Sequence, residues 1–339
     1  MITSAHCSEI ENKLIDGVQV VYVPAIELNS RIRFLIPKCL GAVRDLIINS
    51  NLVHVHNVYY SFNLTMAFLS KFARKFVITS VLSCHDLLKH PNPFVRVGAF
   101  SVEVPANLLI RSSDIIHVKN PLDYARLNKM HDRVIYIPDG IPDEYFHASQ
   151  NPVPFRRKVR VAEENKLILY VGRLHPLKGP QVLVKAMKYI VKEEAKVICV
   201  IVGPGQTYQA FLRKLVLDLG LERNVLLAGI LTEKEKMSAY DAAYVVVVPS
   251  CSDVVEAYSL VASEAWARKN PVVASAVGAL KYRVRSGVDG YLAKPNDPKD
   301  LAEKILRALN LKVNGIPADV RSWNEVTRKF DELYKTVAA

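Results

Sequence analysis

Two cations in one short loop are the first residues of this sequence that could do chemistry. In LILYVGRLHPLKGP (167–180), an apolar run ends at Gly172, and Arg173 and Lys178 follow before Gly179-Pro180 opens a helical pattern. Proline suits a first helical turn because its missing N–H needs no partner there. Permanent cations at the carboxyl end of a strand, beside a helix N-terminus, form a favourable binding site for a diphosphate. On spacing alone, two solvated loop cations fit equally well.

Two glutamates, Glu256 and Glu264, form the second candidate pair, in the segment EAYSLVASE. On one continuous helix they would lie about 80° apart around the axis and about 12 Å apart along it, so they could not share one small ligand. The two carboxylates could share one ligand if Glu256 lies in a loop and the helix begins near Ser259. Backbone N–H groups at that helix start would also bind an anion. The alternative is two surface glutamates, the commoner position of a lone Glu, although the flanking segments are apolar.

Alternating strands and helices must position these residues. Short apolar, β-branched runs alternate with amphipathic stretches, which is typical of parallel βαβ units. The expected strands are Leu52–His56, Phe76–Leu82, Asp114–Val118, Arg133–Ile137, Leu167–Val171, Val197–Val202, Val225–Ala228, Tyr244–Pro249 and Val272–Ser275. The expected helices include Leu64–Arg74, Pro121–Lys129, Gln181–Lys192, Gln209–Leu219, Lys234–Ala242 and Leu260–Lys269. The pattern predicts an α/β protein.

The segment NPVPFRRKVRVAEEN interrupts this periodicity with two prolines and a charge cluster. We interpret it as a linker between a first domain, residues 1–152, and a second, residues 153–321. Two doubly wound parallel sheets would leave a cleft at the carboxyl ends of their strands, where such folds bind ligands.

Charge and composition limit the classes of partner. The net charge is +12, and it is uneven: residues 1–150 hold 15 Lys and Arg against 13 Asp and Glu, whereas residues 151–339 hold 30 against 20. A basic second half suits nucleic acid, an anionic membrane or a phosphorylated ligand. Nucleic acid is disfavoured because no aromatic residues interleave with the basic ones. The five cysteines form no C-x-x-C pair, which argues against disulfides and thiolate zinc. Without a membrane-length apolar run or a signal-peptide pattern, we expect a cytoplasmic protein.

The pairing of GRLHPLKG with EAYSLVASEA resembles the retaining glycosyltransferases of family 4, which have the GT-B fold of two Rossmann-like domains. VIVGPG, GILTEKEKMSAYDAA, KNPVVASAVGAL and SGVDGYLAKPNDPKDLAEKI support the resemblance, which is close from about residue 165 to the end. SWNEVTRKFDELY resembles the family's last helix, so a helix over 322–336 is expected to pack back on the first domain. The resemblance implies a retaining, metal-independent hexosyltransferase. Its co-substrate would be a nucleotide-diphosphate-sugar, with no cofactor, and its acceptor a glycan or a lipid.

The family's site residues carry over by position. Arg173 and Lys178 would bind the diphosphate and stabilise the leaving group. Glu264 would bind the ribose hydroxyls, and Glu256 would hold donor-sugar hydroxyls by positioning and electrostatics, not as a covalent nucleophile. The remaining assignments are backbone N–H groups of Ser259 and Leu260 at the distal phosphate, the backbone of Gly229, Ile230 and Leu231 at the base, and His85 facing the donor sugar.

The first half matches the family more loosely, through the strand-end histidines of LVHVHN and SVLSCHDLL. A period of two residues puts His54 and His56 on one strand face. We expect these two histidines to be hydrogen-bonded core residues and not a pair of metal ligands. We expect no metal site elsewhere.

Several departures from the family matter. Its opening strand, glycine-rich loop and helix have no counterpart here, and a parallel sheet without its first strand leaves neighbouring strands unpaired and apolar surface uncovered. This suggests a competent donor site with weak or no catalysis. Tyr258 and Ser259 replace a usual Phe and Gly, and the Cβ of Ala279 would narrow the sugar pocket or forbid a positive φ. These changes put the donor identity in question.

Three rival functions remain open at this point. One is a phosphorylase or epimerase acting on a similar donor, and another is a non-catalytic nucleotide-sugar-binding or scaffold protein. A dinucleotide oxidoreductase is disfavoured because no G-x-G-x-x-G follows a strand. The basic residues leave room for peripheral contact with an anionic membrane and a lipid acceptor.

Overall fold

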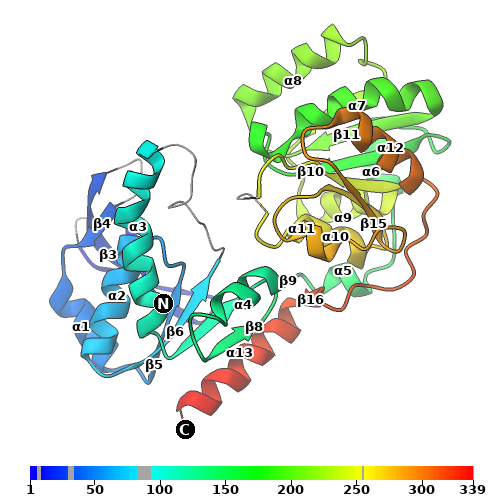
Figure 1. Cartoon of the computed structure of the whole chain (residues 1–339). Helices are drawn as coiled ribbons and strands as arrows, with labels where there is room; N and C mark the ends of the chain where they lie inside the picture. The colour runs from blue at the N-terminus through cyan, green and yellow to red at the C-terminus, as the bar shows by residue number, and fades with distance from the viewer. Residues whose placement is uncertain (6–8, 30–33, 83–92, 254–255, 339) are drawn as a thin grey trace. The chain divides into compact units, whose positions relative to one another are not determined.

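The described part of the chain forms two compact units. The computed structural model describes residues 1–5, 9–29, 34–82, 93–253 and 256–338. Unit 1 comprises Met1–Ile137 with Lys329–Ala339, and unit 2 comprises Pro138–Arg328 (Figure 1). The predicted α/β class with parallel sheets is confirmed. Among the described helices, none has the length and apolarity that a membrane crossing requires.

Unit 2 is built on a parallel sheet of six strands in the order β12-β11-β10-β13-β14-β15. The strands are β10 (Lys166–Val171), β11 (Val197–Val202), β12 (Val225–Gly229), β13 (Val245–Val248), β14 (Val272–Ser275) and β15 (Gly290–Ala293). The helices are α5 (Glu144–His147), α6 (Val153–Val159), α7 (Pro180–Glu193), α8 (Gln206–Asp218), α9 (Glu233–Ala242), α10 (Leu260–Ala267), α11 (Leu280–Arg283) and α12 (Pro298–Ala308). A short parallel pair, β9 (Gly140–Ile141) with β16 (Arg321–Ser322), completes the unit.

Both faces of this sheet are buried, which explains its continuously apolar strands. Along β10, Ile168 packs into a core with α7, α8 and α12, while its neighbour Leu167 packs into a second core with α6, α9 and α10 (Figure 1). A strand that is covered on both faces needs apolar side chains at every position.

The strand order creates one switch point in unit 2. From β10 the chain moves to β11 on one side, and it later returns to β13 on the other side. The loops that leave β10 and β13 therefore diverge at the carboxyl end of the sheet. Open α/β sheets bind ligands in the crevice that forms there.

Unit 1 contains a parallel sheet in the order β5-β6-β7-β8. Its strands are β5 (Leu52–His56), β6 (Phe76–Val81), β7 (Ile115–Val118) and β8 (Val134–Tyr136), each within two residues of its predicted bounds. Its helices are α1 (Leu40–Ile48), α2 (Ser61–Phe72), α3 (Pro93–Ser112) and α4 (Pro121–Leu127).

Before β5 the chain forms a second sheet that the sequence analysis did not predict. Its strands are β1 (Ile2–Ala5), β2 (Glu11–Ile15), β3 (Val18–Asn29) and β4 (Phe34–Pro37). β3 pairs parallel with β1 and antiparallel with β2 and β4. Asp16 and Gly17 join β2 to β3 with φ of 49° and 80°. An Asp-Gly pair with both residues at positive φ is typical of a two-residue hairpin turn, so this signal was available in the sequence.

The structure divides the chain elsewhere than the predicted linker. The segment 151–165 contains α6, whose Phe155 is fully buried in the core of unit 2, and the division falls between Ile137 and Pro138. Proline at the start of α6 begins a helical turn here instead of breaking one. The last helix, α13 (Trp323–Ala338), belongs to unit 1 from Lys329 onward, where Tyr334 hydrogen-bonds to His54 of β5.

Candidate functional site

Lys178 and Glu256 meet at the switch point of unit 2. Lys178 ends a 3₁₀ turn after β10, and its Nζ donates to Glu256 Oε1 at 2.7 Å. The hydroxyl of Ser250 donates to the same oxygen at 2.6 Å. The Glu256 side chain is 2% exposed and that of Lys178 is 23% exposed. The structure therefore brings these two residues into contact, and the carboxylate is shielded while the ammonium still reaches solvent.

A glycine allows this approach. Gly179 has a φ of 74°, and a Cβ built on it would lie 1.8 Å from the carbonyl oxygen of Pro249, at the end of β13. No other residue leaves room for two backbones this close. Cys251 N donates to Leu177 O at 2.8 Å and joins the same two loops. The loop that carries Lys178 is thus fixed against the one that leads to Glu256.

Glu256 is also held by the loop that follows β14. Ala279 N donates to Glu256 O at 2.9 Å, and Gly278 N donates to Asp253 Oδ1 at 2.7 Å. The positive φ in this loop, 49°, belongs to Gly278, whereas Ala279 has a φ of −66°. The concern that Ala279 forbids a required positive φ was therefore wrong, because the neighbouring glycine takes that conformation.

Arg173 lies two residues beyond the end of β10, next to Gly172, and is exposed. Its carbonyl accepts a hydrogen bond from the hydroxyl of Tyr170 at 2.9 Å. Burial raises the pKa of Tyr170, the negative charge of Glu256 adds to the rise, and the positive charge of Arg173 opposes it. Arg173 and Glu256 therefore both lie within electrostatic reach of one phenol. Within the described residues the guanidinium forms no ion pair, which leaves it available to an anion.

Glu264 lies in a cluster of its own with residues of α9. Lys236 Nζ donates to its Oε1 at 3.0 Å, and Tyr240 donates to its Oε2 at 2.6 Å. Burial raises the pKa of Glu264, although Lys236 and Tyr240 act to lower it. Burial lowers the pKa of Lys236, but the charges of Glu264 and Glu233 outweigh it, and the net shift is upward. The structure thus brings Lys178 and Glu256 into contact, and it directs both oxygens of Glu264 toward α9.

The start of α10 matches its prediction. The helix begins at Leu260, with Glu256 in the preceding loop and Glu264 inside the helix. Ser259 takes the left-handed conformation, with a φ of 71°, and its side chain does not cap the helix. The N–H groups of a first helical turn have no partner inside the helix, so this end offers donors to an anion.

Arg283 fixes the approach to α10 and was missed by the sequence analysis. Its guanidinium lies 3.8 Å from the ring centroid of Tyr258, and its Nη1 donates to Ser259 O at 3.0 Å. The hydroxyl of Tyr258 donates to Asp319 O at 2.6 Å, so it is used within the protein. Lys236 and Tyr240 were also missed, although their i, i+4 spacing in α9 put them on one helix face.

The backbone that was predicted to contact the nucleotide base of the donor follows β12. Gly229 has a φ of 73°, and its carbonyl accepts from Gly203 N at 2.8 Å. Ile230 is exposed, and Leu231 packs against the core of unit 2. α9 begins two residues later, so this backbone leads directly to the helix that contacts Glu264.

Of the two histidines of β5, His54 is half-buried and hydrogen-bonded at both ring nitrogens, whereas His56 is exposed. His54 and His56 share a strand face, as predicted, with ring centroids 4.2 Å apart. Nδ1 of His54 shares a hydrogen bond with the hydroxyl of Tyr334 at 2.5 Å, and its Nε2 shares one with Ser80 at 2.7 Å. Burial lowers the pKa of His54 to about 3, and the positive charges of His56 and His117 add to the shift. His85, predicted to face the donor sugar, lies outside the described residues.

Comparison with known proteins shows the family. The family model for glycosyl transferases group 1 matches residues 154–330, which is more than half of the chain. The chain belongs to this family. An uncharacterized glycosyltransferase of Methanocaldococcus jannaschii, MJ1607, is 33% identical over 221 residues, covering 61% of this chain and 55% of the relative. The D-inositol 3-phosphate glycosyltransferase of Frankia alni is 32% identical over 254 residues, covering 70% and 61%. The chain thus spans little more than half the length of these curated relatives.

Solved structures show that this chain has the GT-B fold. HepE of Anabaena, crystallised with UDP, has a TM-score of 0.75 at 19% identity, with 94% of this chain and 87% of that chain covered. WaaG, a glycosyltransferase involved in lipopolysaccharide biosynthesis, has a TM-score of 0.66 at 16% identity, with 97% and 88% covered. Identities this low show the fold alone.

Proposed function

We propose that this group 1 glycosyltransferase moves a sugar from a nucleoside diphosphate sugar to an acceptor hydroxyl, with retention of anomeric configuration. The bond from C1 of the sugar to the diphosphate breaks, and the acceptor oxygen bonds to C1 on the same face. The acceptor proton passes to the departing phosphate oxygen. The observation that carries the proposal is the Lys178–Glu256 pair at the switch point, beside the exposed Arg173.

The cations of the β10 loop would stabilise the leaving group. Negative charge grows on the diphosphate as the sugar departs, and fixed donors aimed at such charge accelerate a reaction most strongly. Arg173 and Lys178 supply two permanent charges, and the first turn of α10, at Ser259 and Leu260, supplies backbone N–H groups. These groups would take the part of a metal ion, so we propose that transfer needs no metal and no cofactor.

The two glutamates would hold the hydroxyls of the donor. A carboxylate has about four lone-pair sites, so Glu256 can accept from sugar hydroxyls while it keeps Lys178 and Ser250. Glu264 can likewise accept from a ribose while it keeps Lys236 and Tyr240. Because Gly229–Leu231 leads into α9, a base placed against that backbone would bring its ribose toward Glu264.

Relatives suggest the chemistry of the substrates. HepE has been crystallised with UDP and with UDP-glucose, so we propose a UDP-sugar donor. For the acceptor we propose a glycan or a lipid, reached in the cytoplasm with peripheral contact to a membrane. A second candidate is a protein that binds the nucleotide sugar with weak or no transfer. It is favoured by unit 1, in which, among the described strands, β1 pairs with β3 alone and β5 with β6 alone.

The test is a transfer assay in the presence of a chelator, with UDP-, GDP- and ADP-sugars and a panel of glycan and lipid acceptors. We expect one donor class to react, and proton NMR to show a first product with the anomeric configuration of the donor. Lys178→Met should abolish transfer, whereas Lys185→Met, which removes an exposed lysine of α7, should not. Donor binding without transfer would favour the second candidate. An inverted product, or loss of transfer with the chelator, would contradict retention or metal independence.

A further inference from the structure

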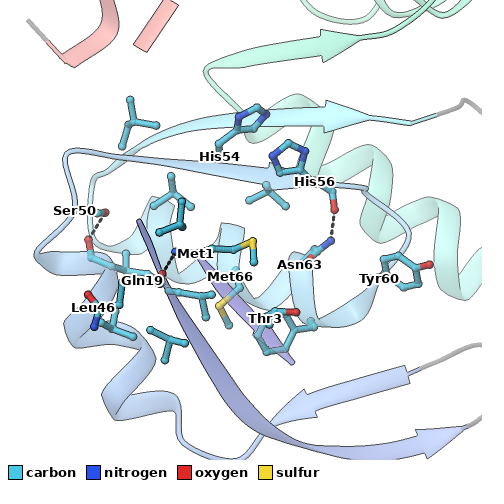
Figure 2. A pocket seen from close by; sticks show the side chains of 18 residues that line it. Met1, Thr3, Gln19, Leu46, Ser50, His54, His56, Tyr60, Asn63 and Met66 are labelled. Carbon is cyan, nitrogen blue, oxygen red and sulfur yellow. Dashed lines mark hydrogen bonds between the residues drawn. The ribbon is translucent and has the colours of Figure 1, made fainter. Parts of the chain in front are cut away.

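Unit 1 contains a cavity of about 930 Å³ between its two sheets (Figure 2). Strands β1, β3 and β5 and helices α1 and α2 line it. Its apolar lining includes Ile2, Val21, Ile47, Val53, Phe62 and Met66. These side chains are partly or wholly buried, and they continue the small apolar core between β3 and the two helices.

One wall of this cavity is the free edge of β1. Among the described strands, β1 pairs with β3 alone. Val21 N donates to Met1 O at 2.8 Å, and the Met1 amino group donates to Gln19 O at 2.6 Å. In a parallel ladder, successive residues direct their N–H and C=O to opposite sides. Because Met1 and Thr3 face β3, Ile2 and Ser4 direct their backbone groups away from it, across the free edge.

The opposite wall is the free edge of β5. Among the described strands, β5 pairs with β6 alone, and Asn57 N donates to Ser80 O at 2.9 Å. Val53 and Val55 share the parity of Asn57 and face β6, so Leu52, His54 and His56 direct their backbone groups toward the cavity. One of these groups is already capped: His56 O accepts a hydrogen bond from the side-chain amide of Asn63.

We infer that this cavity receives one extended β-strand from outside residues 1–339, which joins the two sheets of unit 1 into one. A strand offers donors and acceptors on both edges, and each wall presents backbone groups with the same alternation. A lipid chain of the same size would leave those groups without partners, which is costly where water is excluded. Exposed strand edges are templates for this kind of addition.

The lining defines the sequence that the strand must have. Phe62, Met66 and Ile47 present apolar surface from α1 and α2, so the side chains that face these helices must be apolar. β-branched residues suit such a site because they pack well on a pleated surface. The partner is therefore a short segment of β-branched apolar residues without charges inside the paired stretch.

The test uses a synthetic peptide, acetyl-KVIVIVK-amide, and backbone hydrogen exchange read residue by residue. Binding should slow exchange of the Ser4 and His54 amides about fivefold or more, as expected for a gained hydrogen bond of about 1 kcal/mol. The amides of Val53 and Val55, which already face β6, should change less. The peptide acetyl-KVIPIVK-amide is the matched control, because its central proline lacks the N–H that pairing needs.

A substitution in the wall separates backbone pairing from apolar contact. Ile2→Pro removes both the isoleucine side chain and the N–H that points across the free edge, and it should weaken peptide binding about fivefold. Ile2→Ala removes the side chain but keeps that N–H, so it should weaken binding less. Protection that ignores the alternation, or equal binding of the proline peptide, would overturn the inference. So would protection of the same amides by dodecylphosphocholine, or by self-association of the chain alone, since the occupant would then be a lipid or a second copy.

Discussion

Removing the ammonium of Lys178 should destabilise unit 2 through the carboxylate that it leaves behind. Lys178→Met leaves Glu256, which is 2% exposed, with the hydroxyl of Ser250 on the oxygen that Lys178 had contacted. Breaking a buried ion pair from one side costs about 3–5 kcal/mol. The Lys178 side chain is 23% exposed, so water partly screens the pair, and we expect a loss of about 2–4 kcal/mol.

Removing the carboxylate instead should lower the free energy of unfolding less. The losses of the two single variants should not add in the double variant. Glu256→Gln keeps a hydrogen bond with Ser250 and lets Lys178 turn to solvent, which costs about 1 kcal/mol. In the double variant the neutral amide needs no cation, so we expect a total loss of about 1–2 kcal/mol. The coupling energy of the pair is then about 2 kcal/mol.

Urea denaturation followed by tryptophan fluorescence measures this cycle. Both tryptophans, Trp266 and Trp323, lie in unit 2, and Trp266 is fully buried, so the signal reports on the unit that holds the pair. Lys185→Met is the control for removing a lysine from the same stretch of chain. If the two single losses add to within about 0.5 kcal/mol, the contact between Lys178 and Glu256 does not stabilise the folded protein, and the reasoning fails.

Three further predictions concern other parts of the chain. Ser259→Gly should stabilise unit 2 by about 1 kcal/mol, because a serine at a φ of 71° is strained and glycine is not; urea denaturation showing no gain would contradict this. Tyr240→Phe should destabilise unit 2 by about 1.5–3 kcal/mol, because it removes the hydroxyl that donates to buried Glu264, while Tyr282→Phe at an exposed tyrosine should have no effect in the same assay. Unit 1 should lose stability as the pH falls below about 6.5, by about 1.4 kcal/mol per pH unit, because the folded state lowers the pKa of His54 to about 3 and the unfolded state binds the proton first. His54→Gln should flatten that slope in denaturation series between pH 7.5 and about 4.5, and an unchanged slope would show that His54 does not titrate in this way.

Five of the six strands in the large sheet of unit 2 could be predicted from the sequence because both faces of that sheet are covered by helices, whereas β15 (Gly290–Ala293) was not predicted. Continuous runs such as Val197–Val202 have few competing interpretations, and their bounds agree with the structure to within a residue or two. The sheet before β5 was missed for the opposite reason. All five residues of β2 are exposed, so they show no alternation, and only the turn at Asp16-Gly17 indicated a hairpin.

The site could be predicted only as far as topology determines it. Lys178 and Glu256 follow neighbouring parallel strands, whose carboxyl ends meet at one edge, so their approach could be expected. The contact of Glu264 with Lys236 depends on how α9 packs beside α10, which no local pattern specifies. The segment that holds α6 was misread because its helix is short and is anchored by one residue, Phe155.

Calorimetric titration with UDP, GDP and ADP tests the donor site most directly. We predict that one diphosphate binds, and that Arg173→Ala weakens it by about tenfold to a hundredfold, the effect of losing a charge-assisted hydrogen bond of about 1.5–3 kcal/mol. Glu264→Ala should weaken binding of the same nucleotide, whereas Arg213→Ala, on the exposed face of α8, should not. If none of the three diphosphates binds, or if Arg173→Ala binds as tightly as the unaltered protein, the loop after β10 is not a diphosphate site.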